Sequence, residues 1–138
     1  MATKRMFSLE FLQQPPYLNL TAHLKALYFE LMALADDDGF LYLSDSLLRR
    51  IGAKKSDISR LSSQNLLHLF DNNIVVILHW RMHNTIQKDR YTPTIYHKER
   101  EQLCLDRRKI YRLQANDLDT NLPKKSLTEE KRREENRI

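Results

Sequence analysis

Apolar residues recur along residues 21–35 at the three-and-four spacing of one helix face. The stripe consists of Leu24, Leu27, Tyr28, Leu31 and Leu34. This spacing predicts an amphipathic helix, which Thr21 can cap at its start. The acidic run Asp36-Asp37-Asp38 and Gly39 follow, and they predict a solvated turn in which glycine supplies the positive φ. Residues 40–42 are aromatic and aliphatic, which is typical of a short strand.

Two shorter helices are expected next. Ser44 can cap the first, which ends at Gly52 and turns its apolar residues inward. Ser56 is a plausible cap for the second, beginning at Asp57, and its apolar positions are Ile58, Leu61 and Leu66. Two short helices joined by a tight glycine-containing turn form a helix-turn-helix.

Residues 67–70 and 74–80 are β-branched and aromatic runs, separated by Asp71, Asn72 and Asn73. Asn and Asp tolerate positive φ, so these runs predict a hairpin. A long helix, a strand, two short helices and a hairpin follow one another in the order of a winged helix-turn-helix, with residues 71–73 at the tip of the wing. The predicted fold class is α+β, mainly helical, with a basic helical extension after the winged helix-turn-helix.

The chain divides into four expected parts. Residues 1–20 form an arm that packs on the core, because Pro15 and Pro16 interrupt any long helix there. Residues 21–80 form the winged helix-turn-helix core. Residues 81–113 form a basic extension, with a helix from Thr92-Pro93 to about Leu105. Residues 114–138 are a charged tail that we expect to be disordered, because it has too few apolar residues to build a core.

Charge is distributed unevenly along the sequence. Lys and Arg number 8 against 8 Asp and Glu in residues 1–80, 9 against 4 in residues 81–113, and 6 against 6 in residues 114–138. The net charge of +5 therefore lies in the extension. A local positive excess favours polyanions, among which nucleic acid is the most common candidate in the cytoplasm.

These features predict residues that contact duplex DNA. The exposed side chains of the third helix could read base edges in the major groove. The candidates for base contacts are Ser59, Arg60, Ser63 and Gln64. Basic and amide groups near the turn and after the wing could contact phosphates. The candidates for phosphate contacts are Arg49, Arg50, Lys54, Lys55, Arg81, His83, Asn84, Lys88 and Arg90.

Enzymatic chemistry finds little support in the sequence. Histidines 23, 68, 79, 83 and 97 have no metal-binding spacing, and His79 and His83 are expected on or after a strand, where they do not converge. Gly39 and Gly52 are the only glycines, so no phosphate loop is present. Cys104 is the only cysteine, which excludes an internal disulfide and fits a reducing compartment. We expect no enzyme activity, no cofactor, no metal and no membrane segment, and a cytoplasmic location.

Several segments together resemble a known family. They are residues 4–9 (Lys-Arg-Met-Phe-Ser-Leu), 35–40 (Ala-Asp-Asp-Asp-Gly-Phe), 51–53 (Ile-Gly-Ala), 74–77 (Ile-Val-Val-Ile), 79–81 (His-Trp-Arg), 83–84 (His-Asn) and 88–91 (Lys-Asp-Arg-Tyr). Over about residues 3–105 the chain resembles the N-terminal domain of phage replisome organisers, the DnaD-like replication initiation proteins of phages and prophages of Gram-positive bacteria.

The resemblance implies a winged-helix domain that binds DNA at a phage replication origin, in a bacterial host cell, and recruits host helicase-loading proteins. Residues Arg60, Ser62, Gln64 and Asn65 stand where the family has apolar or basic residues, so a different target sequence, or a changed role, is left open. Family members usually continue into a second, helical domain that contacts the helicase loader and DNA, and this chain stops before it.

The favoured function is a DNA-binding replication protein that contacts duplex DNA through the third helix, the wing and the extension. Two alternatives stay open. One is a transcriptional regulator that binds a palindrome as a homo-oligomer. The other is a protein-interaction adaptor with an exposed apolar patch that includes Phe29, Met32 and Phe40.

Overall fold

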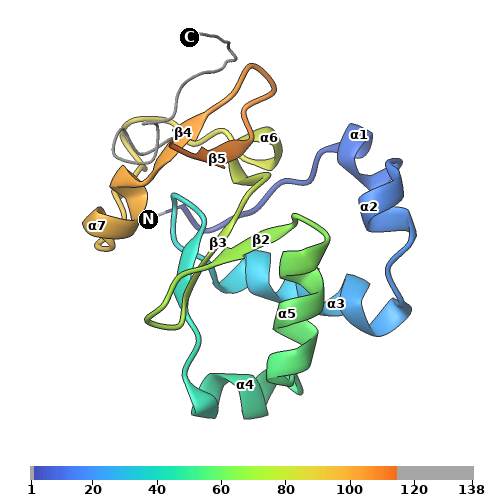
Figure 1. The fold of residues 1–138 in the computed structure, drawn as a ribbon. Coiled ribbons are helices and arrows are strands. Elements are labelled where there is room, and N and C mark those ends of the chain that lie inside the picture. Colours follow the sequence, from blue (N-terminus) through green and yellow to red (C-terminus); the bar gives the residue numbers. More distant parts are fainter. Residues whose placement is uncertain (1, 115–138) are drawn as a thin grey trace, which may run out of the picture.

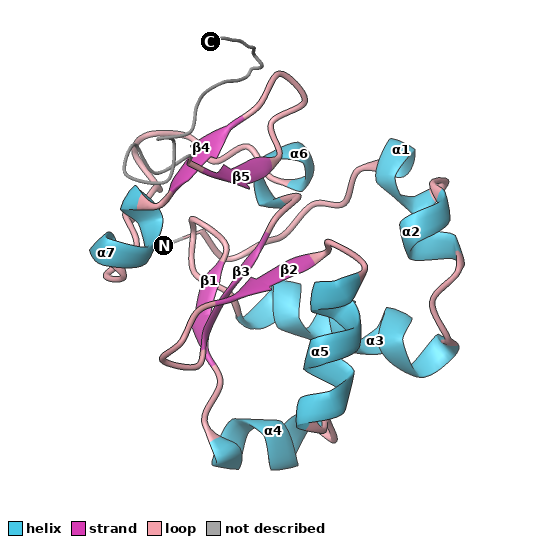
Figure 2. Ribbon diagram, in the orientation of Figure 1, coloured by secondary structure: helices cyan, strands magenta, loops and turns pink. Residues whose placement is uncertain are grey.

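The computed structural model describes residues 2–114, which fold into seven short or medium helices and five strands (Figures 1 and 2). In chain order the elements are α1 (Leu9–Leu12), α2 (Pro15–Leu18), α3 (Ala22–Leu34), β1 (Phe40–Tyr42), α4 (Asp45–Ile51), α5 (Lys55–Ser63), β2 (Leu67–Leu69), β3 (Ile74–Ile77), α6 (Trp80–His83), α7 (His97–Glu101), β4 (Leu103–Leu105) and β5 (Tyr111–Leu113). The fold is α+β. The predicted tail, residues 114–138, lies outside the described residues except for Gln114.

The main sheet is antiparallel and has the order β1-β3-β2. Val75 of the central strand lies opposite Leu41 on one side and Leu69 on the other. All four residues of β3 are buried, as expected for a strand with neighbours on both edges and helices beside it (Figure 2). Leu31 of α3 and Leu61 of α5 are fully buried in the same core, so the two helices and the sheet share one hydrophobic interior.

Several local predictions are confirmed. The Thr21 hydroxyl accepts the Leu24 N–H at 3.2 Å and caps α3. The Ser44 hydroxyl accepts the Leu47 N–H at 3.0 Å and caps α4. Gly52 ends α4 with a φ of 72°, and Asn73 in the hairpin turn has a φ of 64°. Residues 40–42 form the expected strand. Residue types that favour caps and turns therefore predicted these helix ends and this turn correctly.

The third helix was misplaced at both ends. It begins at Lys55, two residues before the predicted start, so Ser56 lies inside its first turn. Asp57 takes the capping role instead, because its carboxylate accepts the Lys54 N–H at 2.9 Å. The helix ends at Ser63, and Asn65 turns the chain with a φ of 61°. Leu66 is therefore buried beyond the helix rather than on it.

The second hairpin strand ends at Ile77 rather than at residue 80. Trp80 begins the helical turn α6, and its indole N–H donates to the Asp37 carbonyl at 2.8 Å. This turn also places His79 and His83 against the same ring, that of Phe11, with ring centroids 4.7 Å away in each case. The expectation that the two histidines do not converge was wrong, because the strand gives way to a helical turn.

The predicted helix over residues 92–105 is also wrong. Only His97–Glu101 is helical, and Leu103–Leu105 forms a strand that pairs with Tyr111–Leu113. Residues 92–94 are not helical, and they are tied to the turn after α3, because the Thr92 and Thr94 N–H groups donate to the Asp37 and Asp38 carboxylates at 3.0 and 2.8 Å. The extension is thus a short helix followed by a hairpin.

The N-terminal arm packs on the core, as expected, and its most buried aromatic residue is Phe11. Phe11 of α1 is 1% exposed and stacks on Tyr28 of α3 with ring centroids 5.3 Å apart. Pro15 occupies the first position of α2, where a helix does not need its missing N–H. Two single-turn helices therefore replace the irregular arm, because the prolines limit helix length without preventing a turn.

The acidic turn after α3 is buried, not solvated. Asp37 and Asp38 are 0% and 2% exposed. The Asp38 carboxylate pairs with the Arg81 guanidinium and accepts the Tyr91 hydroxyl at 2.7 and 2.8 Å. Its backbone carbonyl accepts the Tyr111 hydroxyl at 2.9 Å.

Asp37 connects the N-terminal arm to the same turn. Its carboxylate accepts the Ala2 N–H at 3.2 and 3.3 Å and lies 3.6 Å from the Arg5 guanidinium. Residues 36–39 therefore form a polar hub that connects the arm, the extension and the terminal hairpin to the main sheet. Gly39, the last residue of this hub, has a φ of 92° and lies against the Trp80 ring, which leaves no room for a side chain.

Candidate nucleic-acid interface

The α4 and α5 helices meet at a three-residue connection, residues 52–54. Gly52 adopts the left-handed conformation there, which costs any other L-residue energy. Asp57 fixes the start of α5, since it accepts the Lys54 N–H and lies 3.1 Å from His23 Nε2 on α3. These hydrogen bonds, led by the one from Lys54, lower the pKa of Asp57.

The exposed face of α5 is polar along its length. Ser59, Arg60 and Ser63 are exposed, while Ile58 and Leu61 face the core. At 100° per residue the three exposed residues share one side of the helix. The fourth predicted base contact, Gln64, is exposed but lies just after the helix, where its N–H donates to the Arg60 carbonyl.

Ser56 is the residue of this face that the sequence analysis missed. It is exposed and precedes Ser59 and Arg60 by three and four residues. The prediction that Ser56 caps the helix excluded it from the exposed face. Its spacing of three and four residues from Ser59 and Arg60 was nevertheless visible in the sequence. The Ser63 hydroxyl donates to the Arg60 carbonyl at 2.8 Å, so it remains available to a ligand mainly as an acceptor.

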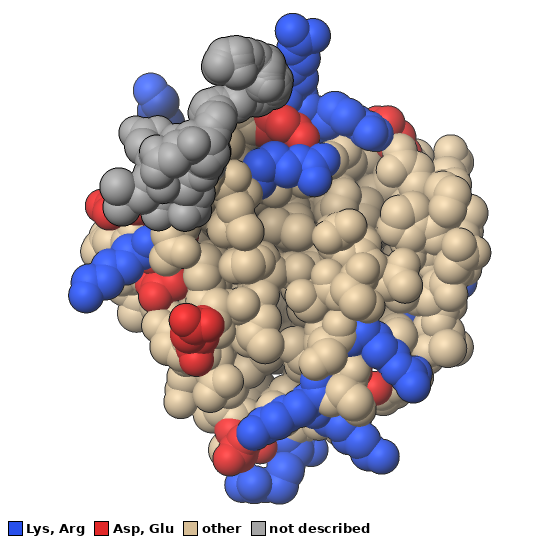
Figure 3. Space-filling model, in the orientation of Figure 1, with Lys and Arg blue, Asp and Glu red and all other residues tan. Residues whose placement is uncertain are grey.

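Basic side chains flank this polar face. Arg49 and Arg50 lie in the last turn of α4, and Lys54 and Lys55 begin α5. All four are exposed, and none belongs to an ion pair among residues 2–114. Figure 3 shows Lys and Arg side chains gathered over the end of the molecule formed by α4 and the start of α5. This end therefore carries more positive than negative side chains, since Asp45 is the only acidic residue of α4 and none of the four cations is held in an ion pair.

Two predicted phosphate contacts are buried and serve the fold instead. The His83 ring is 4% exposed; its Nδ1 accepts the Ser8 N–H at 2.9 Å, and its Nε2 lies 2.9 Å from the Tyr28 hydroxyl. Burial lowers the pKa of His83 to about 4, so the ring is neutral near pH 7. Asn84 is 3% exposed and its Oδ1 accepts the Met6 N–H at 2.8 Å. Both hold the arm and do not form a charged surface.

Three arginines of the extension form ion pairs within the fold. Arg81 pairs with Asp38, Arg108 with Glu10 at 3.0 Å, and Arg112 with Asp106 at 3.0 Å. Arg81 is therefore unsuited to the phosphate contact predicted for it. Lys88 and Arg90 are exposed, but their loop follows α6, which lies at the opposite end of the molecule from α4 (Figure 1).

The hairpin turn at residues 71–73 brings acidic groups to the surface. Asp71 is exposed, and the Asn72 amide donates to the Glu99 carboxylate of α7 at 2.9 Å. The turn is thus tied back to the extension and lies among negative charges. Phosphate contacts from this turn would meet electrostatic repulsion.

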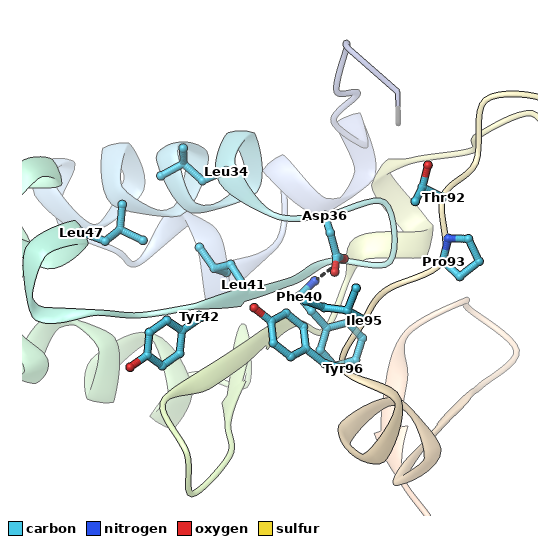
Figure 4. Close-up of a pocket in the computed structure, with 10 residues that line it drawn as sticks. All are labelled: Leu34, Asp36, Phe40, Leu41, Tyr42, Leu47, Thr92, Pro93, Ile95 and Tyr96. Atoms are coloured by element: carbon cyan, nitrogen blue, oxygen red, sulfur yellow. Dashed lines mark hydrogen bonds between the residues drawn. The ribbon is translucent and has the colours of Figure 1, made fainter.

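An apolar groove of about 470 Å³ lies beside β1 (Figure 4). Its exposed members include Leu34, Tyr42 and Ile95, which are 45%, 51% and 76% exposed. The apolar patch predicted around Phe29, Met32 and Phe40 was misplaced, because Met32 and Phe40 are 0% and 1% exposed. Leu34 was expected to be buried and faces this groove instead.

Within residues 2–114 no cluster of three or more His, Cys, Asp or Glu side chains is arranged to hold a metal ion. None of the helices in the same range is long and apolar enough to cross a lipid bilayer. Comparisons with known protein families, curated proteins and solved structures found no match. The functional assignment therefore depends on the chemistry of the surface.

Proposed function

We propose that this chain is a winged-helix DNA-binding protein of phage or prophage replication, which places α5 in the major groove of duplex DNA. The element order α3-β1-α4-α5-β2-β3 and the sheet order β1-β3-β2 support the winged-helix part of this proposal. The replication role is supported by the sequence resemblance to phage replisome organisers.

The observation that carries DNA binding is the combination of a polar helix face and unpaired cations beside it. Arg60 can donate two hydrogen bonds to a guanine edge, and serine hydroxyls can contact any base. Arg49, Arg50, Lys54 and Lys55 flank this face and would contact the phosphates that border the groove. The contact surface is therefore smaller than the sequence analysis expected, since Arg81, His83, Asn84 and the acidic turn at residues 71–73 contribute little.

Binding to a random 40-base-pair duplex, followed by fluorescence anisotropy over a salt series, tests this proposal. Four phosphate contacts predict a slope of log K against log salt of about −4. Replacing Arg49, Arg50, Lys54 and Lys55 by Gln should reduce the slope towards zero and weaken binding to every sequence. Lys98→Gln/Arg107→Gln is the matched control, because both side chains are exposed cations outside this face, and it should keep most of the affinity.

The function is refuted if the wild-type protein fails to bind duplex DNA at low salt. Equal losses in the fourfold variant and the control would reject α4 and α5 as the contact surface. Arg60→Ala should instead change the preference among sequences, while its effect on the salt slope stays near one contact. Analytical ultracentrifugation with and without a palindromic duplex separates the replication protein from a dimeric transcriptional regulator.

A second function, that of an adaptor, is favoured by the groove beside β1. Exposed apolar surface next to polar groups is typical of sites where proteins dock. If this surface engages a host helicase-loading protein, Ile95→Ser should weaken that complex in a titration of the two purified proteins and leave DNA binding unchanged. Leu113→Ser, which alters an exposed leucine outside the groove, is the control.

A further inference from the structure

A second cleft lies where the start of the arm meets the loop after α6. It has a volume of about 330 Å³, within the range of roughly 300–1,000 Å³ that is common for small-molecule sites. The lining comes from residues 2–6 and 84–90, two segments that are far apart in the sequence. The lining residues are Ala2, Thr3, Lys4, Met6, Asn84, Thr85, Ile86, Gln87 and Arg90.

The cleft has the electrostatic character of an anion site. Lys4 from the arm and Arg90 from the loop both line it, and neither forms an ion pair within the described part of the chain. No acidic side chain is among the lining residues. The buried carboxylate of Asp37, which lies near Ala2, is already occupied by the Ala2 and Thr92 N–H groups and by Arg5.

Asn84 gives an independent indication that the cleft takes a polar ligand. Its Oδ1 accepts the Met6 N–H at 2.8 Å, but its Nδ2 is buried and has no hydrogen-bond partner among the described residues. A buried donor without a partner costs about 1–3 kcal/mol. A ligand oxygen in the adjoining cleft would remove this cost if a small shift of the loop exposed the amide.

We propose that this cleft binds the phosphate group of a small phosphorylated ligand, such as a nucleoside monophosphate. Lys4 from the arm and Arg90 from the loop supply positive charge, and Asn84 supplies an amide donor. Thr3, Thr85 and Gln87 offer further hydrogen bonds, and Met6 and Ile86 provide apolar contact for the rest of the ligand. The site is separate from the proposed DNA-binding face, because α6 and α4 lie at opposite ends of the molecule (Figure 1).

The test is a titration of the ¹⁵N-labelled full chain with inorganic phosphate, with AMP and with a 20-base-pair duplex, at constant ionic strength. We expect saturable shifts in the amide signals of residues 3–6 and 84–90. Arg90→Gln should weaken phosphate and AMP binding by about tenfold or more, because a hydrogen bond to a charged group is lost. Lys88→Gln, an exposed cation of the same loop that does not line the cleft, should bind as the wild type does.

Asn84→Asp provides a second variant. It preserves an acceptor for the Met6 N–H and replaces the free donor by a negative oxygen, so it should abolish binding while thermal unfolding confirms that the chain is folded. Shifts with AMP identify a free phosphate ester as the ligand, whereas shifts in the cleft with the duplex alone identify a backbone phosphate. No shift with any of the three, or shifts that Arg90→Gln leaves unchanged, would overturn the proposal.

Discussion

Replacing Asp38 by Asn tests the hub that joins the extension to the main sheet. All partners of this carboxylate are donors: the Arg81 guanidinium, the Tyr91 hydroxyl and the Thr94 N–H. An amide offers only one acceptor oxygen and turns its NH₂ group towards these donors. The change therefore leaves Arg81 without its counter-charge beside a side chain that is 2% exposed.

Removing one partner of a buried ion pair costs about 3–5 kcal/mol. For a domain of this size, a loss of about 3 kcal/mol lowers the melting temperature by on the order of 10–20 °C. Differential scanning calorimetry of Asp38→Asn against wild type measures this shift. Glu10→Gln is the matched control, because it also breaks a carboxylate–arginine pair, the one with Arg108, but at an exposed site, where a pair contributes about 0–1 kcal/mol. Similar shifts for the two variants would refute the buried hub.

Two further predictions concern glycine and histidine. Gly39→Ala should destabilise the protein more than Gly52→Ala does. At Gly39 the new Cβ would lie 2.7 Å from Trp80, whereas at Gly52 nothing lies within 4 Å. Gly52→Ala should therefore lose only about 1–2 kcal/mol of stability, because of its positive φ. Urea unfolding of both variants checks this order, and equal losses would contradict it. Burial lowers the pKa of His83 and of His79 from 6.5 to about 4, so between these pH values the unfolded chain binds protons that the folded protein does not. The free energy of unfolding should be highest above pH 6.5 and should fall as the pH decreases towards 4. The loss should reach about 3 kcal/mol for His83 and be smaller for the more exposed His79. Urea unfolding at several pH values measures the fall, and a His83→Gln variant with an unchanged slope would contradict the assignment.

Local signals in the sequence predicted the main elements between residues 21 and 77. Thr21, Ser44 and Gly52 act through their own side chain or φ on adjacent residues, so a sequence window contains the whole cause. The run of β-branched residues at 74–77 acts in the same way, because such side chains favour the pleated strand.

The errors have a different cause, which is contact between distant segments. Residues 92–94 look like a helix start, but Asp37 and Asp38, more than 50 residues earlier, accept the Thr92 and Thr94 N–H groups and tie this segment to the turn after α3. Three consecutive aspartates usually remain in water, because burying a carboxylate without partners is costly. Only the fold shows that Arg5, Arg81 and several N–H groups supply those partners.

The same long-range pairing relocates the positive charge that indicated nucleic-acid binding. Counted along the sequence, residues 1–80 are neutral and the extension carries the excess. In the structure, Arg81 and Arg108 of the extension pair with Asp38 and Glu10 of the first part. Asp38 and Glu10 were counted among the acidic residues that balance the Lys and Arg of residues 1–80. In the fold they neutralise arginines of the extension instead.

The cations at α4 and α5 are among those that form no ion pair within residues 2–114. Folding therefore leaves part of the uncompensated charge beside the exposed polar face of α5, although the net charge of residues 1–80 is zero. Because electrostatic attraction in water is effective over only about 10 Å at moderate salt, the position of free charges decides where a polyanion binds, and the net charge of a segment does not. The arginines that form internal pairs should thus contribute to stability, and the unpaired ones beside α5 to DNA affinity.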